Sequence, residues 1–166
     1  MTLRDGRYRD GGAGGSGGTR GPGAGSASPV TGLAHVAIAT RDADALAAAL
    51  VAALGATRGA EELLDGGALR VVFVHLGPVT LELLEPRSPD HTVAKFLDRR
   101  GEGLHHVSLE VRDLDAALSH CRAAGVGLID ETPRPGAHGT EVAFLHPKSL
   151  GGVLIELCGR RAERIP

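Results

Sequence analysis

Apolar and polar residues alternate over short stretches of this chain, which predicts β-strands separated by a few helices. From Leu33 to Thr40 the alternation places Val36 and Ile38 on one face of a strand and His35 on the other. Further strands are predicted, in chain order, at Thr57–Leu64, Leu69–Leu76, Val79–Leu84, Leu104–Val111, Val126–Asp130, Thr140–His146 and Val153–Cys158.

Helices are predicted between these strands, where capping residues frame runs rich in alanine and leucine. Asp42 begins one such run, which ends at Gly55, and Asp113 begins another, which ends near Ala124. His91–Arg100 predicts a third helix, which links the two halves of the chain.

The order of elements repeats along the chain. GLAHVAIATRDADA (Gly32–Ala45) matches GLHHVSLEVRDLDA (Gly103–Ala116) at a shift of 71 positions, and RVVFVH (Arg70–His75) matches EVAFLH (Glu141–His146) at the same shift. Each copy reads as a β-α-β-β-β module, so the sequence predicts an α+β fold made of two such modules.

The predicted domain spans residues 31–159, with modules at 31–86 and 102–159 and the linking helix at 91–100. Residues 1–30 form a glycine-rich segment with too few apolar side chains to offset the entropy of ordering it. We therefore expect a disordered tail there, and a second, frayed tail at 160–166.

Composition excludes several classes of function. Eighteen basic and 20 acidic residues leave a formal charge of −2, which gives no reason to expect binding to nucleic acid or to an anionic membrane. No apolar run is long enough to cross a membrane or to act as a signal peptide. The two cysteines, Cys121 and Cys158, lack C-x-x-C spacing, so we expect reduced thiols in a cytoplasmic protein.

The repeat also duplicates a histidine and a glutamate. His35 corresponds to His106, and Glu82 corresponds to Glu156 when three inserted residues are allowed. Strand alternation places all four on the face that the module helices leave uncovered. Two imidazoles and two carboxylates are suited to a divalent first-row metal, although the glutamates could instead line a polar groove.

Four motifs together point to a known family: AKFL, GEGLHH, PRPGAHG and HPKS-x-GGVLIEL. Over about Gly32 to Leu157 the chain resembles the vicinal oxygen chelate superfamily, and within it the methylmalonyl-CoA epimerases. The resemblance implies a paired, curved mixed sheet with the module helices on its outer face. It also implies an acyl-CoA substrate and a homodimer.

The resemblance implies roles for particular residues. His35, Glu82, His106 and Glu156 fall on metal-ligand positions, and some members carry glutamine in place of Glu82. Cobalt is the expected metal, while Mn, Ni or Zn also suit these ligands. Because the symmetric pair Glu82 and Glu156 approaches the substrate from opposite sides, one of the two is expected to act as both ligand and proton-transfer base, and Glu156 is the preferred one. The expected substrate contacts are Lys148, Ser149 and His138.

One position departs from the family pattern. Certain members place an acid/base glutamate on the strand after the Gly66-Gly67 turn, where this chain has Val71. The expected reaction is metal-assisted proton transfer that interconverts (R)- and (S)-methylmalonyl-CoA. A glyoxalase I-type lactoylglutathione lyase and a metal-free small-molecule binding module of the same fold are the alternatives.

Overall fold

The computed structural model describes residues 29–160, so most of both predicted tails, at 1–28 and 161–166, lies outside the described residues. In chain order the elements are β1 (Val30–Ala39), α1 (Ala43–Leu54), β2 (Thr57–Leu64), η1 (Asp65–Gly67), β3 (Leu69–Leu76), β4 (Val79–Pro86), α2 (Thr92–Arg100), β5 (Gly103–Val111), α3 (Leu114–Ala123), β6 (Arg134–Pro135), η2 (Ala137–Gly139), β7 (Thr140–Leu145), η3 (Pro147–Ser149) and β8 (Ile155–Arg160). No helix in this range is long and apolar enough to cross a membrane.

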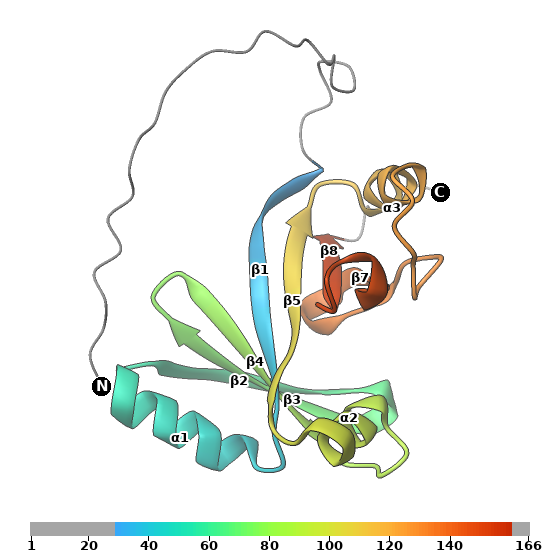
Figure 1. The fold of residues 1–166 in the computed structure, drawn as a ribbon. Helices are drawn as coiled ribbons and strands as arrows, with labels where there is room; N and C mark the ends of the chain where they lie inside the picture. Colours follow the sequence, from blue (N-terminus) through green and yellow to red (C-terminus); the bar gives the residue numbers. More distant parts are fainter. Residues whose placement is uncertain (1–28, 161–166) are drawn as a thin grey trace, which may run out of the picture.

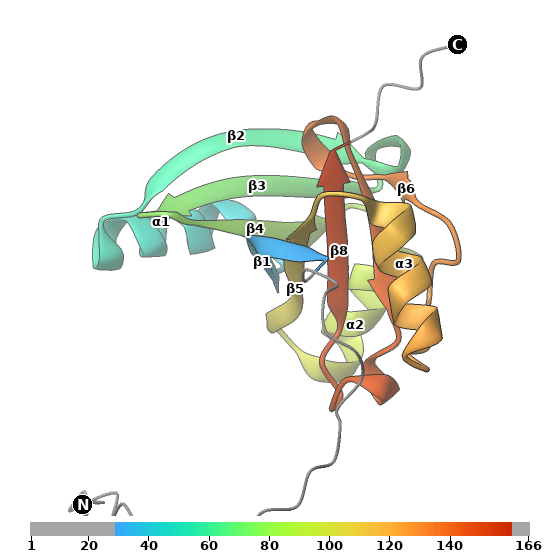
Figure 2. The ribbon, with the colours of Figure 1, turned by 90° about the horizontal axis from the view of Figure 1, so that it is seen from above.

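All eight strands form one mixed sheet in the order β2-β3-β4-β1-β5-β8-β7-β6. Within each module the first strand pairs in parallel with the last, β1 with β4 and β5 with β8, while β1 and β5 pair antiparallel and join the modules. Figures 1 and 2 show the sheet curling, with one module on each side of the β1–β5 pair. The predicted α+β fold of two βαβββ modules is confirmed.

The module helices α1 and α3 cover the outer face of the sheet. Asp42 caps α1 by accepting a hydrogen bond from the Ala45 N–H, and Asp113 caps α3 by accepting one from the Ala116 N–H. The helix α1 packs on apolar side chains of β3 and β4, and α3 packs on those of β7 and β8. The linking helix α2 instead packs against the inner face, where Val93 and Leu97 belong to one apolar cluster with Ala37, Val71 and Leu84.

Leu83 lies at the centre of the α1 core, where its side chain is fully buried. Replacing it by alanine should lower the free energy of unfolding by about 2–5 kcal/mol, because the cavity left behind adds to the lost apolar burial. Chemical denaturation measures the change. Leu63→Ala is the matched control, since Leu63 is 56% exposed and its loss should change stability little; equal effects of the two substitutions would contradict the packing described.

An ion network covers the outer edge of the first module. Arg70 donates hydrogen bonds to Asp44 over 3.0 Å and to Glu61 over 2.6 Å, and Arg58 lies 2.7 Å from Asp44. Hydrogen bonds from Arg70, then from Arg58, lower the pKa of Asp44 from 3.8 to about 2, and the bond from Arg70 lowers the pKa of Glu61. Glu61 is thus held toward this outer edge.

This network predicts an acid dependence of stability. Since the folded-state pKa of Asp44 is depressed, its contribution is present above about pH 4 and is lost as the pH falls toward about 2. Urea denaturation between these pH values should show the free energy of unfolding falling with pH. The Arg70→Met variant should show a shallower fall, and an unchanged slope would contradict the prediction.

One predicted strand, Val126–Asp130, is wrong. Leu128 forms only an isolated bridge with Leu145, and the amide groups of Ile129 and Asp130 both donate to the Phe144 carbonyl. The Asp130 carboxylate accepts a hydrogen bond from the Phe144 N–H. That N–H is therefore not free to pair with the backbone of a continuing strand. The edge strand is instead the two-residue β6, which lies between the strands predicted at Val126–Asp130 and Thr140–His146.

Candidate active site

The sheet register brings the duplicated histidines and glutamates to one place on the inner face. Ala37 on β1 lies directly opposite Glu82 on β4 and His106 on β5. Ser108 on β5 lies opposite His35 on β1 and Glu156 on β8. Because opposite residues share a face of the sheet, all four candidate side chains point to the same side.

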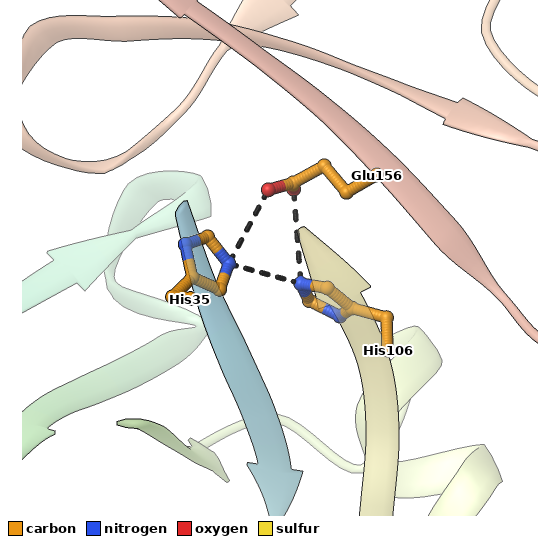
Figure 3. Close-up of side chains that lie close together, drawn as sticks. All are labelled: His35, His106 and Glu156. Carbon is orange, nitrogen blue, oxygen red and sulfur yellow. Dashed lines mark hydrogen bonds and ion pairs between the residues drawn. The ribbon is translucent and has the colours of Figure 1, made fainter. Parts of the chain in front are cut away.

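Three of the four converge on a single point (Figure 3). The Nε2 atoms of His35 and His106 are 3.2 Å apart, and Glu156 Oε1 lies 3.3 Å from His35 Nε2. Glu156 Oε2 lies 3.8 Å from His106 Nε2. Ligand atoms of these buried residues all lie within 4.8 Å of one another, a spacing that could hold a metal ion.

Glu82 meets the opposite edge of the His35 ring, with its Oε1 atom 3.2 Å from Nδ1. On His106 the corresponding Nδ1 atom lies 2.9 Å from Nδ1 of His105. Each imidazole is therefore held through Nδ1, which turns Nε2 toward the cluster. Partners of this kind fix the orientation and tautomer of metal-binding histidines.

Burial controls the charges in the cluster. It lowers the pKa of His35 to about 4 and that of His106 to about 2, so both rings are neutral at pH 7. Burial raises the pKa of Glu82 to about 8 and that of Glu156 to about 7, and for Glu82 the nearby charges of Glu156 and Glu62 add to the effect. Two buried carboxyl groups thus lie beside neutral imidazoles with little positive charge to compensate them.

This donor set fits a divalent cation. When both Nδ1 atoms carry the proton, two Nε2 lone pairs face each other over 3.2 Å, next to the Glu156 carboxylate. Nitrogen and oxygen donors in this arrangement suit first-row metals, and a cation would offset the burial of the carboxylates.

Ser108 supports Glu156 and was not among the residues predicted for the site. Its side chain is fully buried, and its hydroxyl donates a hydrogen bond of 2.7 Å to Glu156 Oε1. Strand alternation places it on the inner face with His106, two positions along the same strand, and this spacing is the signal in the sequence that could have indicated its role. Phe144 lies opposite Glu156 in the β7–β8 pair, with its ring centroid 5.0 Å from that of His106 in an edge-on arrangement.

The cluster opens into a cavity of about 1420 Å³. Both walls of the curled sheet line it, together with α2 and the segment before β7; His35, Glu82, His106, Glu156 and His138 are all among the lining residues. This volume exceeds the roughly 300–1,000 Å³ of pockets that hold drug-sized ligands, so a larger molecule fits.

The three predicted substrate contacts lie in different surroundings. His138 lines the cavity, whereas Lys148 and Ser149 are exposed in η3, next to the lining residue Pro147. The Ser149 hydroxyl accepts a hydrogen bond from the Gly127 N–H over 3.0 Å, which gives it a role in holding the loop.

Comparison with known proteins places the chain among characterised relatives. Residues 34–144 match the family model of the glyoxalase/bleomycin resistance protein/dioxygenase superfamily. Over 137 residues the chain is 39% identical to mitochondrial methylmalonyl-CoA epimerase of Bos taurus, an alignment that covers 82% of this chain and 78% of that protein.

Solved structures give the same result. A methylmalonyl-CoA epimerase from Mycobacterium tuberculosis matches with a TM-score of 0.77 and 36% identity, covering 83% of this chain and 93% of that one. A methylmalonyl-CoA epimerase in complex with methylmalonyl-CoA and NH₄⁺ matches with a TM-score of 0.75 and 34% identity, covering 82% of this chain and 99% of that one.

Proposed function

We infer the function from the family, since this chain belongs to the glyoxalase/bleomycin resistance protein/dioxygenase superfamily and, within it, to the methylmalonyl-CoA epimerases. The chain is an isomerase that interconverts (R)- and (S)-methylmalonyl-CoA. In the structure, the observation that carries this assignment is the buried group of His35, His106 and Glu156 beside a large cavity. The relatives are epimerases, so the lyase and the metal-free binding module are not favoured.

The reaction moves the proton on C2, the carbon between the thioester and the carboxylate. Glu156 is the proposed base: its carboxylate takes the C2 proton while the C–H electron pair moves into the enolate. A carboxylate can remove this proton when nearby positive charge stabilises the enolate that forms. The Ser108 hydroxyl holds the carboxylate in place.

His35, His106 and Glu156 are the proposed ligands of a divalent metal, with Glu82 as the fourth. When bound, the metal supplies positive charge beside the oxygens on which the negative charge of the enolate collects. The contact between Glu82 and His35 Nδ1 also supports an orienting role for Glu82. Cobalt is the proposed metal, and Mn, Ni and Zn suit the same donors.

The proposed substrate contacts are His138 within the cavity and Lys148 and Ser149 near its mouth. Arg99, Arg100 and Arg134 also line the cavity, and their positive charges suit the carboxylate and phosphates of an acyl-CoA. A homodimer in the cytoplasm completes the proposal. Leu33, which is 49% exposed on the central strand β1, supports a subunit interface there.

The test is exchange of the C2 proton for deuterium, followed by NMR in heavy water with methylmalonyl-CoA and each of the four metals in turn. We expect exchange and interconversion of the epimers, both dependent on the metal. Absence of exchange with every metal would refute the epimerase function. The hemithioacetal of glutathione is the control substrate, since its turnover would indicate the lyase instead.

A further inference from the structure

Inversion at C2 requires a proton to leave one face of the carbon and another to arrive at the opposite face. Glu156 approaches from β8 of the second module, and the facing wall of the cavity is built by β3 and β4 of the first module. If the epimerase function holds, a second group that carries a proton must stand on this first-module wall.

His138 stands there, although it belongs to the second module. Its ring packs against that of Phe73 in a tilted arrangement, with the ring centroids 4.1 Å apart. Phe73 lies directly opposite Glu82 in the β3–β4 pair, so His138 lies over the wall beside the buried cluster. The loop that carries it, between β6 and β7, lies next to the end of β2 (Figure 2).

Glu62 on β2 fixes the orientation of this histidine. Its Oε1 atom is 2.6 Å from His138 Nδ1, and its Oε2 atom accepts a hydrogen bond of 3.1 Å from the His138 N–H. The backbone of His138 is left-handed, with φ 53°, an uncommon conformation outside glycine that this two-point contact helps to hold. Glu62 on β2 lies directly opposite Val71 on β3. The neighbouring strand therefore places a carboxylate next to the position where certain family members have a glutamate and this chain has Val71.

A carboxylate on Nδ1 leaves Nε2 as the atom that exchanges protons with a substrate. In the neutral ring the carboxylate keeps the proton on Nδ1, so that Nε2 is a base. Among the described residues, none bonds to His138 Nε2. The side chain is 54% exposed, so it can also exchange protons with water.

Outside the buried cluster, the other histidines that line the cavity have different hydrogen-bond partners. His91 uses Nδ1 to cap α2 and Nε2 to bind Asp65. His105 holds His106, and His75 lies within reach of Thr80 at the β3–β4 hairpin. His138 is therefore the histidine that combines a carboxylate partner with a free nitrogen in the cavity.

We propose that His138 is the second proton-transfer residue of the epimerisation, acting through Nε2 on the face of C2 opposite Glu156, and that Glu62 is its positioning residue. In one direction Glu156 removes the C2 proton and the His138 imidazolium donates a proton to the other face. The enzyme then holds a protonated Glu156 and a neutral His138, and exchange with water restores the starting form. The reverse reaction uses the same two residues with their protonation states interchanged.

The experiment follows each epimer separately in heavy water with His138→Gln, measuring deuterium at C2 and conversion to the other epimer. Conversion should fall by about 10²–10⁴-fold, while one epimer still exchanges its proton through Glu156. Glu62→Gln should give the same one-sided exchange with a smaller loss of conversion, and Glu62→Asp should restore part of it. Glu61→Gln is the matched control, because Glu61 bonds Arg70 on the outer edge, and it should match the wild type.

Two results would overturn the proposal for His138. One is conversion by His138→Gln at the wild-type rate, and the other is an equal loss of exchange from both epimers, which indicates a general role in binding or folding. If His138→Gln fails to fold, the same ratio of deuterium exchange to conversion is measured for His138→Asn and Glu62→Gln. Wild-type protein without exchange refutes the epimerase function itself, so the two failures are distinct.

Discussion

Glu156→Gln is expected to reduce kcat for epimerisation by about 10²–10⁴-fold, the usual contribution of a well-placed general base. Glutamine keeps the size of the side chain and can still accept the Ser108 hydrogen bond, but its amide cannot take the C2 proton. The measurement is the rate of interconversion of the two epimers at saturating substrate, with the melting temperature recorded to establish that the variant is folded.

The same variant also bears on metal binding, because Glu156 lies within the possible ligand group. Calorimetric titration of the variant with Co²⁺ separates the two roles. If Glu156 is not required as a ligand, the variant binds Co²⁺ about as tightly as the wild type; if it is required, the variant loses affinity as well as activity. Glu110→Gln is the control, since Glu110 is an exposed carboxylate on the strand next to Glu156. Wild-type turnover by Glu156→Gln would rule out the assigned base.

Added metal is expected to stabilise the folded protein, by about 2.7 kcal/mol at a free Co²⁺ concentration of 100 times Kd. The gain arises because the folded chain gathers donors that the unfolded chain keeps apart. His35→Ala and His106→Ala should each lose most of this gain, since each removes one of the two Nε2 atoms that face each other over 3.2 Å. Denaturation with and without the metal measures the difference.

The matched control for these variants is His120→Ala, which removes an exposed histidine from α3, away from the cluster. It should keep the full gain in stability, and a chelator should remove that gain from both the control and the wild type. If His35→Ala and His106→Ala keep the gain as well, the stabilising metal binds elsewhere and the proposed ligand group is wrong.

The repeat and the strand alternation were sufficient to predict that His35, His106, Glu82 and Glu156 share one face. Both depend on local spacing, and neighbouring strands turn such spacing into contact when they pair in register. The finer geometry could not be predicted. That Glu82 meets Nδ1 of His35 while Glu156 meets Nε2 depends on side-chain rotations that the order of residues does not specify.

The pairing of His138 with Glu62 was also beyond prediction from the sequence. The two residues are 76 positions apart and belong to different modules. The loop that carries His138 has no periodic pattern from which its contact with β2 could be predicted. The wrong strand at Val126–Asp130 has a related cause. Its apolar residues fit a strand, but the Asp130 side chain binds the backbone of β7 and ends the pairing.

The β1–β5 pair joins residues about 70 positions apart in the chain. This separation also determines when during folding the protein can become active. Pairings between distant segments form late, because the entropy of closing a long loop must be overcome before any contact is gained. The helices α1 and α3 can form locally, whereas His35, His106 and Glu156 meet only after β1, β5 and β8 have paired. On refolding, the far-ultraviolet signal of the helices should therefore recover before enzymatic turnover does.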